Sequence, residues 1–160
     1  DNAGFSIKYS DLNTVKEIIS SKEKINSIIL SPDGKKLAGA GDNGSLFVWD
    51  VTDNFKETIL YKNPNDTRGR KLGLSSVGFT RDGSRLIFGD INGLVRIIPM
   101  NNPAAIRVLS GHTAAIEQIT FNHAGTFMAT ASYDKTVRIW NLDLLNAQPI
   151  VLDDHADWVR

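Results

Sequence analysis

The sequence contains no cysteine, and its charges cancel, with 18 Lys and Arg against 18 Asp and Glu in 160 residues. Without cysteine, a disulfide framework and a thiolate zinc site are both excluded. A formal net charge of zero gives no general attraction to nucleic acid or to an anionic membrane, because both require a positive electrostatic field. We therefore expect neither nucleic acid nor a membrane as a partner.

The sequence also lacks an apolar run of bilayer-spanning length, and no signal peptide stands at its first residue. These features predict a cytoplasmic protein, although the redox compartment stays open. A hydrophobic content of 41% and a charged content of 22% are ordinary for a globular chain. The length is that of about one domain with a buried core.

A turn signal recurs along the chain. Ser31-Pro32-Asp33-Gly34 returns as Thr80-Arg81-Asp82-Gly83 and as Asn122-His123-Ala124-Gly125, so positions 31, 80 and 122 lie 49 and then 42 residues apart. Trp49, Ile98 and Trp140 recur at the same two intervals. A period of roughly 40–45 residues with four short strands is that of a propeller blade. The longer interval indicates an inserted loop at residues 62–71.

Each repeat shows four short strands separated by turn residues. Proline presets φ in Ser31–Gly34, its glycine accepts a positive φ, and Asp42-Asn43-Gly44 is typical of a hairpin turn. No segment is long enough to favour a helix. The predicted strands are Ile25–Leu30, Lys36–Gly41, Leu46–Trp49 and Glu57–Tyr61, then Ser75–Phe79, Arg85–Gly89, Leu94–Ile98 and Ile106–Leu109, then Ile116–Phe121, Phe127–Ala131, Thr136–Trp140 and Pro149–Leu152.

The predicted fold is an all-β propeller, a partial ring of four-stranded antiparallel blades. We expect blades at residues 21–61, 62–110 and 111–153, with the last two strands of a preceding blade in 1–20. Residues 154–160 should start a further blade, with Trp158-Val159-Arg160 opening its inner strand. Three blades cannot close a ring, and the exposed faces of terminal blades predict association. Further blades would come from the same longer chain, which we favour, or from another copy.

Gly111-His112, the Ser132-Tyr133-Asp134 turn and Trp140-Asn141 resemble the WD-repeat family of β-propellers, and Trp49-Asp50 matches the dipeptide that names it. The resemblance covers essentially the whole chain. It implies a structural hydrogen-bonded set inside the third blade, formed by His112, Ser132, Asp134 and Trp140.

The first two repeats depart from this pattern. Ser21, Gly41 and Asn43 stand at the corresponding positions of the first, and Gly69-Arg70 and Ile98-Pro99 at those of the second. We therefore expect those blades to be held mainly by apolar packing.

His112, Ser132 and Asp134 also have the composition of a catalytic triad. The sequence has no Gly-x-Ser-x-Gly elbow, and Ser132 is expected inside a sheet rather than on a sharp turn, so the structural interpretation is favoured. The three histidines, His112, His123 and His155, lack the short spacing of metal ligands. We expect no metal, no cofactor and no enzymatic activity.

The resemblance implies a non-catalytic scaffold or sensor module that binds proteins or peptides through the loops on one propeller face. Aromatic and arginine side chains dominate interface energetics. The candidate contacts are Tyr133, Glu117 and Trp158 near those loops, and Arg70 and Lys71, with Arg68, in the inserted loop. The alternatives are burial of the two aromatic residues between blades and a tolerated surface insertion.

Two other functions stay open. A hydrolase or metal-dependent enzyme with a site in the central channel would need inward-facing acids or histidines, and the starts of the inner strands supply mainly Asn26, Ser75 and Glu117. A purely architectural spacer is the third possibility. The stretch from Gln148 to Val159 resembles bacterial members, many of which are C-terminal sensor modules of signalling proteins with an NTPase domain.

Overall fold

The computed structural model describes the backbone of residues 5–11, 14–21 and 23–159, and the side chains of residues 23–159. This part of the chain forms fourteen strands joined by turns. Within it, no helix is long and apolar enough to cross a membrane. The side chain of Ser21 and the whole of Arg160, both named above, lie outside the described residues.

The strands form one hairpin and three four-stranded antiparallel sheets, each with its strands in chain order. The hairpin is β1 (Phe5–Asp11) and β2 (Thr14–Ser21). The first sheet is β3 (Ile25–Leu30), β4 (Lys36–Gly41), β5 (Ser45–Asp50) and β6 (Lys56–Lys62). The second is β7 (Leu74–Phe79), β8 (Arg85–Asp90), β9 (Val95–Pro99) and β10 (Arg107–Leu109). The third is β11 (Ile116–Phe121), β12 (Phe127–Ser132), β13 (Val137–Asn141) and β14 (Ile150–Leu152).

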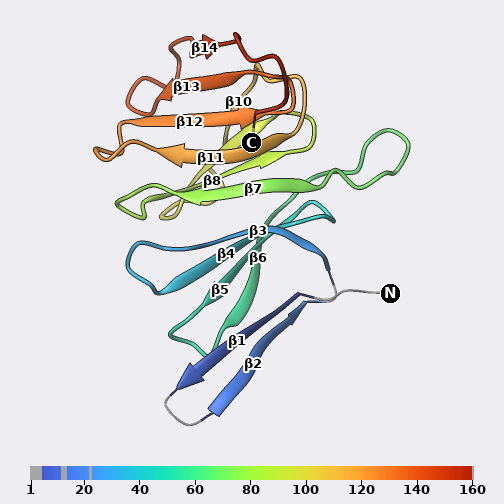
Figure 1. Ribbon diagram of the computed structural model, residues 1–160. Helices are drawn as coiled ribbons and strands as arrows, with labels where there is room; N and C mark the ends of the chain where they lie inside the picture. Colours follow the sequence, from blue (N-terminus) through green and yellow to red (C-terminus); the bar gives the residue numbers. More distant parts are fainter. Residues whose placement is uncertain (1–4, 12–13, 22, 160) are drawn as a thin grey trace.

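Figure 1 shows the sheets following one another in an arc that does not close. The prediction of an all-β partial ring of four-stranded antiparallel sheets is confirmed. The predicted strand positions agree with the observed ones to within about two residues at each end. Trp158 and Val159, predicted to open a further inner strand, lie outside any strand among the described residues, and whether they begin another blade stays a prediction. The Val159 N–H donates instead to the Ser132 carbonyl (3.2 Å), beside the turn that follows β12.

The turn after the first strand has the same side-chain chemistry in the first and second sheets. Ser31 Oγ donates to Asp33 Oδ1 (2.7 Å), and Thr80 Oγ1 donates to Asp82 Oδ1 (2.7 Å). The glycine that ends each of these two turns has a φ of 71° or 68°, a left-handed conformation that glycine adopts without steric cost. The sequence repeat is therefore a repeat of side-chain bonds that fix where β3 and β7 stop.

The core lies between neighbouring sheets, as expected when sheets stack face to face in a ring. Buried side chains between the first and second sheets include Ala38, Ala40, Leu46, Leu74, Leu86 and Phe88. Buried side chains between the second and third sheets include Ile87, Val95, Ile97, Ile116, Met128 and Trp140. Because the second sheet is covered on both faces, β8 and β9 are nearly continuous apolar runs.

The outer face of the third sheet is open. Its Val137 and Ile139 are only partly buried, whereas Leu46 and Val48, which hold the equivalent positions in the first sheet, are 0% and 7% exposed. Ile150 on the edge strand β14 is 59% exposed. The second sheet covers one face of the first sheet. Among the described residues, nothing covers the equivalent face of the third sheet.

Candidate functional site

A buried line of hydrogen bonds joins four side chains of the third repeat. Trp140 Nε1 lies 2.9 Å from Thr130 Oγ1, and Thr130 Oγ1 lies 2.8 Å from His112 Nε2. His112 Nδ1 lies 2.8 Å from Asp134 Oδ2. One proton assignment satisfies every group: the indole N–H donates to the hydroxyl, the hydroxyl donates to Nε2, and Nδ1–H donates to the carboxylate.

The electrostatics of this line agree with that assignment. Burial lowers the pKa of His112, and this outweighs the opposing influence of Asp134, so the imidazole is neutral near pH 7. Burial would raise the pKa of Asp134, but hydrogen bonds from Thr136, from the Thr113 N–H and from His112 lower it to about 2. The line therefore ends at the Asp134 carboxylate, and both of its oxygens accept hydrogen bonds.

The sequence predicts Ser132 in this set, and the structure places Thr130 between the histidine and the tryptophan instead. Thr130 and Ser132 share one face of β12, so alternation alone cannot choose between them. Trp140 pairs directly with Met128, and Thr130 is the next residue on the same face. Ser132 Oγ donates to the Ala114 carbonyl (3.1 Å) and accepts the Asp134 N–H (3.1 Å). Since His112 bonds Thr130 and not Ser132, the contact between nucleophile and base that a triad requires is missing.

A different polar network occupies the second sheet. Arg96 Nη1 lies 2.7 Å from Asp90 Oδ2, and the two side chains are 10% and 1% exposed. The Asp90 carboxylate also accepts the N–H groups of Asn92 (2.9 Å) and Leu94 (3.1 Å). The Arg96 guanidinium lies over the Tyr61 ring, 5.3 Å from its centroid. The prediction that apolar packing mainly holds this sheet overlooks a buried ion pair.

The first sheet uses a third arrangement. Trp49 Nε1 donates to Glu57 Oε2 (2.9 Å), and its ring stacks with Phe47 at 5.6 Å. Gly39 stands where Thr130 stands in the third sheet, and a Cβ there would come within 2.8 Å of the indole. Because Gly39 has no side chain, the Trp49 ring fits against the backbone there. The ring packs with Leu37 and Phe47, so this sheet is held largely by apolar packing.

The five candidate contact residues lie at one end of the strands. Tyr133 and Trp158 stack with centroids 4.8 Å apart at 29°, and Trp158 is 54% exposed. Glu117 is partly buried at the start of β11. Arg70 and Lys71 belong to the loop between β6 and β7, which projects from the arc in Figure 1. The structure therefore brings the two aromatic residues together and holds the two cations on a separate projection.

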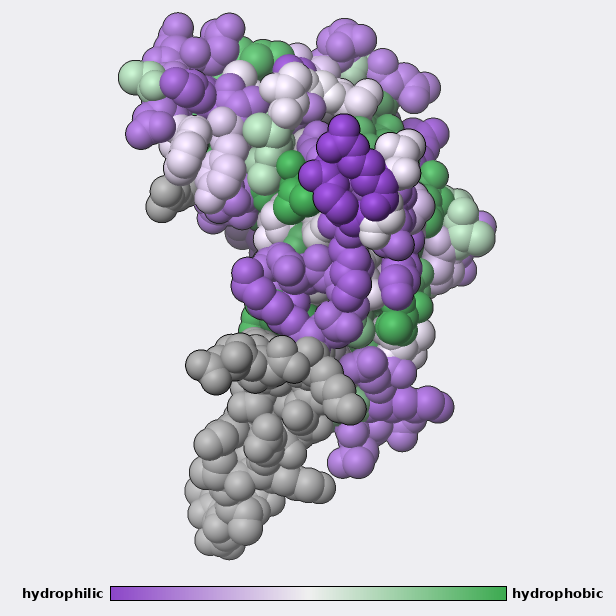
Figure 2. Space-filling model, turned by 90° about the vertical axis from the view of Figure 1, so that its right-hand side faces the viewer, coloured by the Kyte–Doolittle hydropathy of each residue, from purple (hydrophilic) through white to green (hydrophobic). Residues whose placement is uncertain are grey.

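That loop is ordered by Asp66. Its carboxylate accepts the N–H groups of Arg68 (2.9 Å) and Arg70 (2.7 Å), and Arg70 Nε lies 2.7 Å from its Oδ2. Lys71 Nζ lies 4.0 Å from Glu23 Oε2. Figure 2 views the molecule from the side on which the loop projects and shows strongly hydrophilic residues there. The inserted loop is therefore an ordered projection with a net positive charge, although the Asp66 carboxylate offsets part of the charge of its arginine and lysine residues.

The residues considered for a channel enzyme have a structural explanation. Asn26, Ser75 and Glu117 each stand at the register shift at the start of their strand, so each is the extra residue of a β-bulge. Asn26 Nδ2 donates to the Leu74 carbonyl (2.8 Å), and Ser75 Oγ donates to the Gly89 carbonyl (3.3 Å). Among the described side chains, no group of three or more His, Asp or Glu is placed to hold a metal ion.

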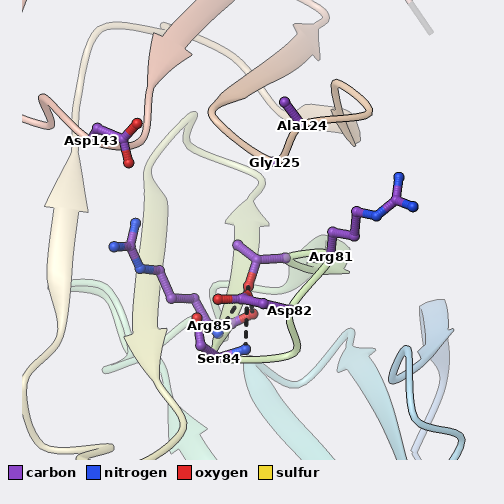
Figure 3. Close-up of a pocket in the computed structure, with 8 residues that line it drawn as sticks. Arg81, Asp82, Ser84, Arg85, Ala124, Gly125 and Asp143 are labelled. Carbon is purple, nitrogen blue, oxygen red and sulfur yellow. Dashed lines mark hydrogen bonds between the residues drawn. The ribbon is translucent and has the colours of Figure 1, made fainter.

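The opposite end of the strands carries features that the sequence did not single out. A cavity of about 390 Å³ lies between the turn after β7 and the turn after β11, and residues of both turns line it with Asp143 (Figure 3). A neighbouring cavity of about 370 Å³ lies between the turns after β3 and β7. Their signal in the sequence is Arg81, on the turn after β7, which lines both cavities. Arg85, at the start of β8, lines the first cavity only.

Comparison with known proteins gives matches to repeat proteins. Residues 13–50 and 104–141 match the family model described as WD40, the WD domain or G-beta repeat. Meiotic recombination protein rec14 of Schizosaccharomyces pombe is 30% identical over 116 residues, which cover 72% of this chain and 36% of that protein. The WD repeat-containing protein WDS homolog of Arabidopsis thaliana is 29% identical over 136 residues, covering 84% and 25%. The chain thus spans 36% or less of the length of these relatives.

Solved structures show the same fold. The WD40 repeats of RRP9 superimpose with a TM-score of 0.73 at 21% identity, over 89% of this chain and 42% of that one. The WD40 β-propeller domain of Doa1 gives a TM-score of 0.71 at 19% identity, over 89% and 44%.

The predicted likeness to bacterial members is not borne out, because the relatives found are eukaryotic. Nothing in these relatives supports a signalling role. The matched stretches and the three four-stranded sheets agree with each other. Residues 13–50 and 104–141 thus match WD40 repeats, and the described part of the chain has the fold of a WD-repeat β-propeller whose ring is not closed.

Proposed function

We propose that the chain is a non-catalytic scaffold that binds protein or peptide partners through the loops at the end of the strands that carries Tyr133 and Trp158. The names of similar proteins support such a role. One curated relative, 22% identical over 131 residues, is by name a subunit of chromatin assembly factor 1 of Mus musculus. A structure of the mitotic checkpoint complex contains a chain of the same fold, with a TM-score of 0.72.

The observation that carries the proposal is the rigid setting of the aromatic pair. The segment before Val159 is tied to the turn after β12 by three contacts: the Val159 N–H to the Ser132 carbonyl, Lys135 Nζ to the Ala156 carbonyl (3.0 Å), and the ring stack. An exposed indole held in place loses little conformational entropy on binding. Tryptophan and tyrosine are also the residue types that most often dominate binding energy.

Trp158→Ala should weaken partner binding by at least about tenfold, the range of an aromatic hot spot. The ring is 54% exposed, so the fold should persist. The measurement is quantitative mass spectrometry of proteins cross-linked to the wild-type chain, to Trp158→Ala and to Leu144→Ala. Leu144 is the matched control, because it is 62% exposed at the opposite end of the strands.

Proteins lost with Trp158→Ala and retained with Leu144→Ala would support the proposal. The same captured set with all three chains would contradict it and would favour the architectural spacer. Arg70→Gln, compared in the same experiment, tells whether the basic loop belongs to the same surface.

We also propose that a further four-stranded blade, from the same longer chain or from another copy, covers the open face of the third sheet. The support is the contrast between the partly buried Val137 and Ile139 and their fully packed equivalents in the first sheet. An apolar face of this kind favours association in water. Sedimentation velocity of the isolated chain should therefore show self-association at micromolar concentration. A stable, monodisperse monomer would contradict this expectation.

A further inference from the structure

The cavity of about 390 Å³ at the opposite end of the strands is built from two sheets. The second sheet contributes Thr80, Arg81, Asp82, Ser84 and Arg85, and the third contributes Ala124, Gly125 and Asp143. The volume lies within the range of about 300–1,000 Å³ that is common for binding sites. In Figure 3 the Arg85 side chain extends toward Asp143, and Arg81 extends on the side of the turn that carries Ala124 and Gly125. The cavity therefore has an arginine on each flank.

Both arginines are held by the third sheet. Arg81 Nη1 donates to the His123 carbonyl (2.9 Å) and lies 2.6 Å from His123 Nδ1. Arg85 Nη1 donates to the Leu142 carbonyl (3.0 Å). Each bond uses one Nη and leaves Nε and the other Nη, which form the edge that binds a carboxylate with two parallel hydrogen bonds. The arginines are therefore oriented in advance, and no described residue bonds their remaining N–H groups.

The two aspartates of the cavity differ in what they offer. Asp82 is engaged by its own turn, because Oδ1 accepts from Thr80 Oγ1 (2.7 Å) and from the Ser84 N–H (3.0 Å), and these bonds lower its pKa to about 2. The Asp143 carboxylate makes no hydrogen bond or ion pair with any described residue. The cavity therefore presents spare guanidinium donors and one spare carboxylate acceptor.

An extended peptide segment with an acidic side chain matches this pattern. Its carboxylate supplies acceptors for the arginine edges, and its backbone N–H groups supply donors for Asp143. We propose that the cavity between the turns after β7 and β11 binds the Asp or Glu side chain of an acidic peptide partner, with Arg81 and Arg85 as its anchors. This site goes beyond the scaffold role assigned to the other end and does not depend on it.

The test uses two fluorescein-labelled peptides, one with a single central glutamate between glycine and serine residues and one with glutamine in its place. Fluorescence anisotropy gives the affinity of each for the wild-type chain. The glutamate peptide should bind at least tenfold more tightly than the glutamine peptide. Arg85→Gln should remove most of that difference. Arg68→Gln, at an exposed arginine of the loop between β6 and β7 that does not line this cavity, should change nothing.

Arg85 also bonds the Leu142 carbonyl of the third sheet, so Arg85→Gln could destabilise the fold. A lower thermal unfolding temperature of this variant would show such a loss. Asp143→Asn keeps the proposal testable, because the Asp143 side chain has no partner to lose among the described residues. The substitution removes a like charge and keeps an acceptor, so the glutamate peptide should bind several-fold more tightly. The proposal would be overturned if the two peptides bound with equal affinity or if Asp143→Asn bound the glutamate peptide more weakly. A loss with Arg68→Gln equal to that with Arg85→Gln would also overturn it. Trp158→Ala should leave peptide binding unchanged, which separates this site from the aromatic one.

Discussion

Asp90→Ala is expected to lower the free energy of unfolding by about 3–5 kcal/mol, the cost of breaking a buried ion pair by removing one partner. Arg96 would keep its charge at a position where its side chain is only 10% exposed, with no carboxylate beside it. The N–H groups of Asn92 and Leu94 would lose their acceptor at the same time. Urea denaturation followed by tryptophan fluorescence measures the change.

A double-mutant cycle shows whether the loss of stability in Asp90→Ala comes from the unpaired positive charge of Arg96. Arg96→Met together with Asp90→Ala replaces the pair by apolar side chains, and such replacements are often close to neutral. The double variant should therefore be more stable than Asp90→Ala alone. Asp53→Ala is the matched control, because it removes an ion pair with Lys56 whose side chains are 67% and 73% exposed, and exposed pairs contribute little. An Asp90→Ala chain as stable as the control would show that the pair does not hold the sheet.

Asp90 also illustrates what the sequence could not supply. Asp90 and Arg96 are six residues apart on adjacent strands, and their pairing depends on the register of β8 against β9. In the well-formed third repeat, Ser132 and Arg138 stand at these two positions, so the change from serine to Asp90 looked like simple loss. In the structure the departure is a substitution of one polar network for another. The relevant signal was an acid and a base on the core-facing side of two otherwise apolar strands.

The strands themselves were predictable because their limits are local. Ser31, Thr80 and Asn122 each start a turn whose bonds close within five residues, and such turns can be recognised without knowing what packs on them. The cavity between the second and third sheets was not predictable in this way. Arg85 reaches the Leu142 carbonyl, 57 residues later in the chain, and that contact depends on how two sheets sit against each other. Long-range placement of this kind leaves no local pattern.

Thr130→Val is the second substitution with a large expected effect. The sequence predicts Ser132 instead of Thr130 in the hydrogen-bonded set. Valine keeps the shape of threonine and removes the hydroxyl that joins two buried groups. Trp140 Nε1 would lose its acceptor and His112 Nε2 its donor. Each buried polar group left without a partner costs about 1–3 kcal/mol. The free energy of unfolding should therefore fall by about 2–6 kcal/mol, the sum of the two penalties, measured by urea denaturation.

Two further variants identify the cause of that loss. Thr130→Ser keeps the hydroxyl and removes only a methyl group, so it should be clearly more stable than Thr130→Val. Thr120→Val makes the same chemical change at an exposed position of β11 and should have little effect. If Ser132→Ala instead proved more damaging than Thr130→Val, the hydroxyl named by the family pattern would be the one that matters. The geometry argues against that result, because the Ser132 hydroxyl bonds backbone groups near the turn and touches neither the indole nor the imidazole.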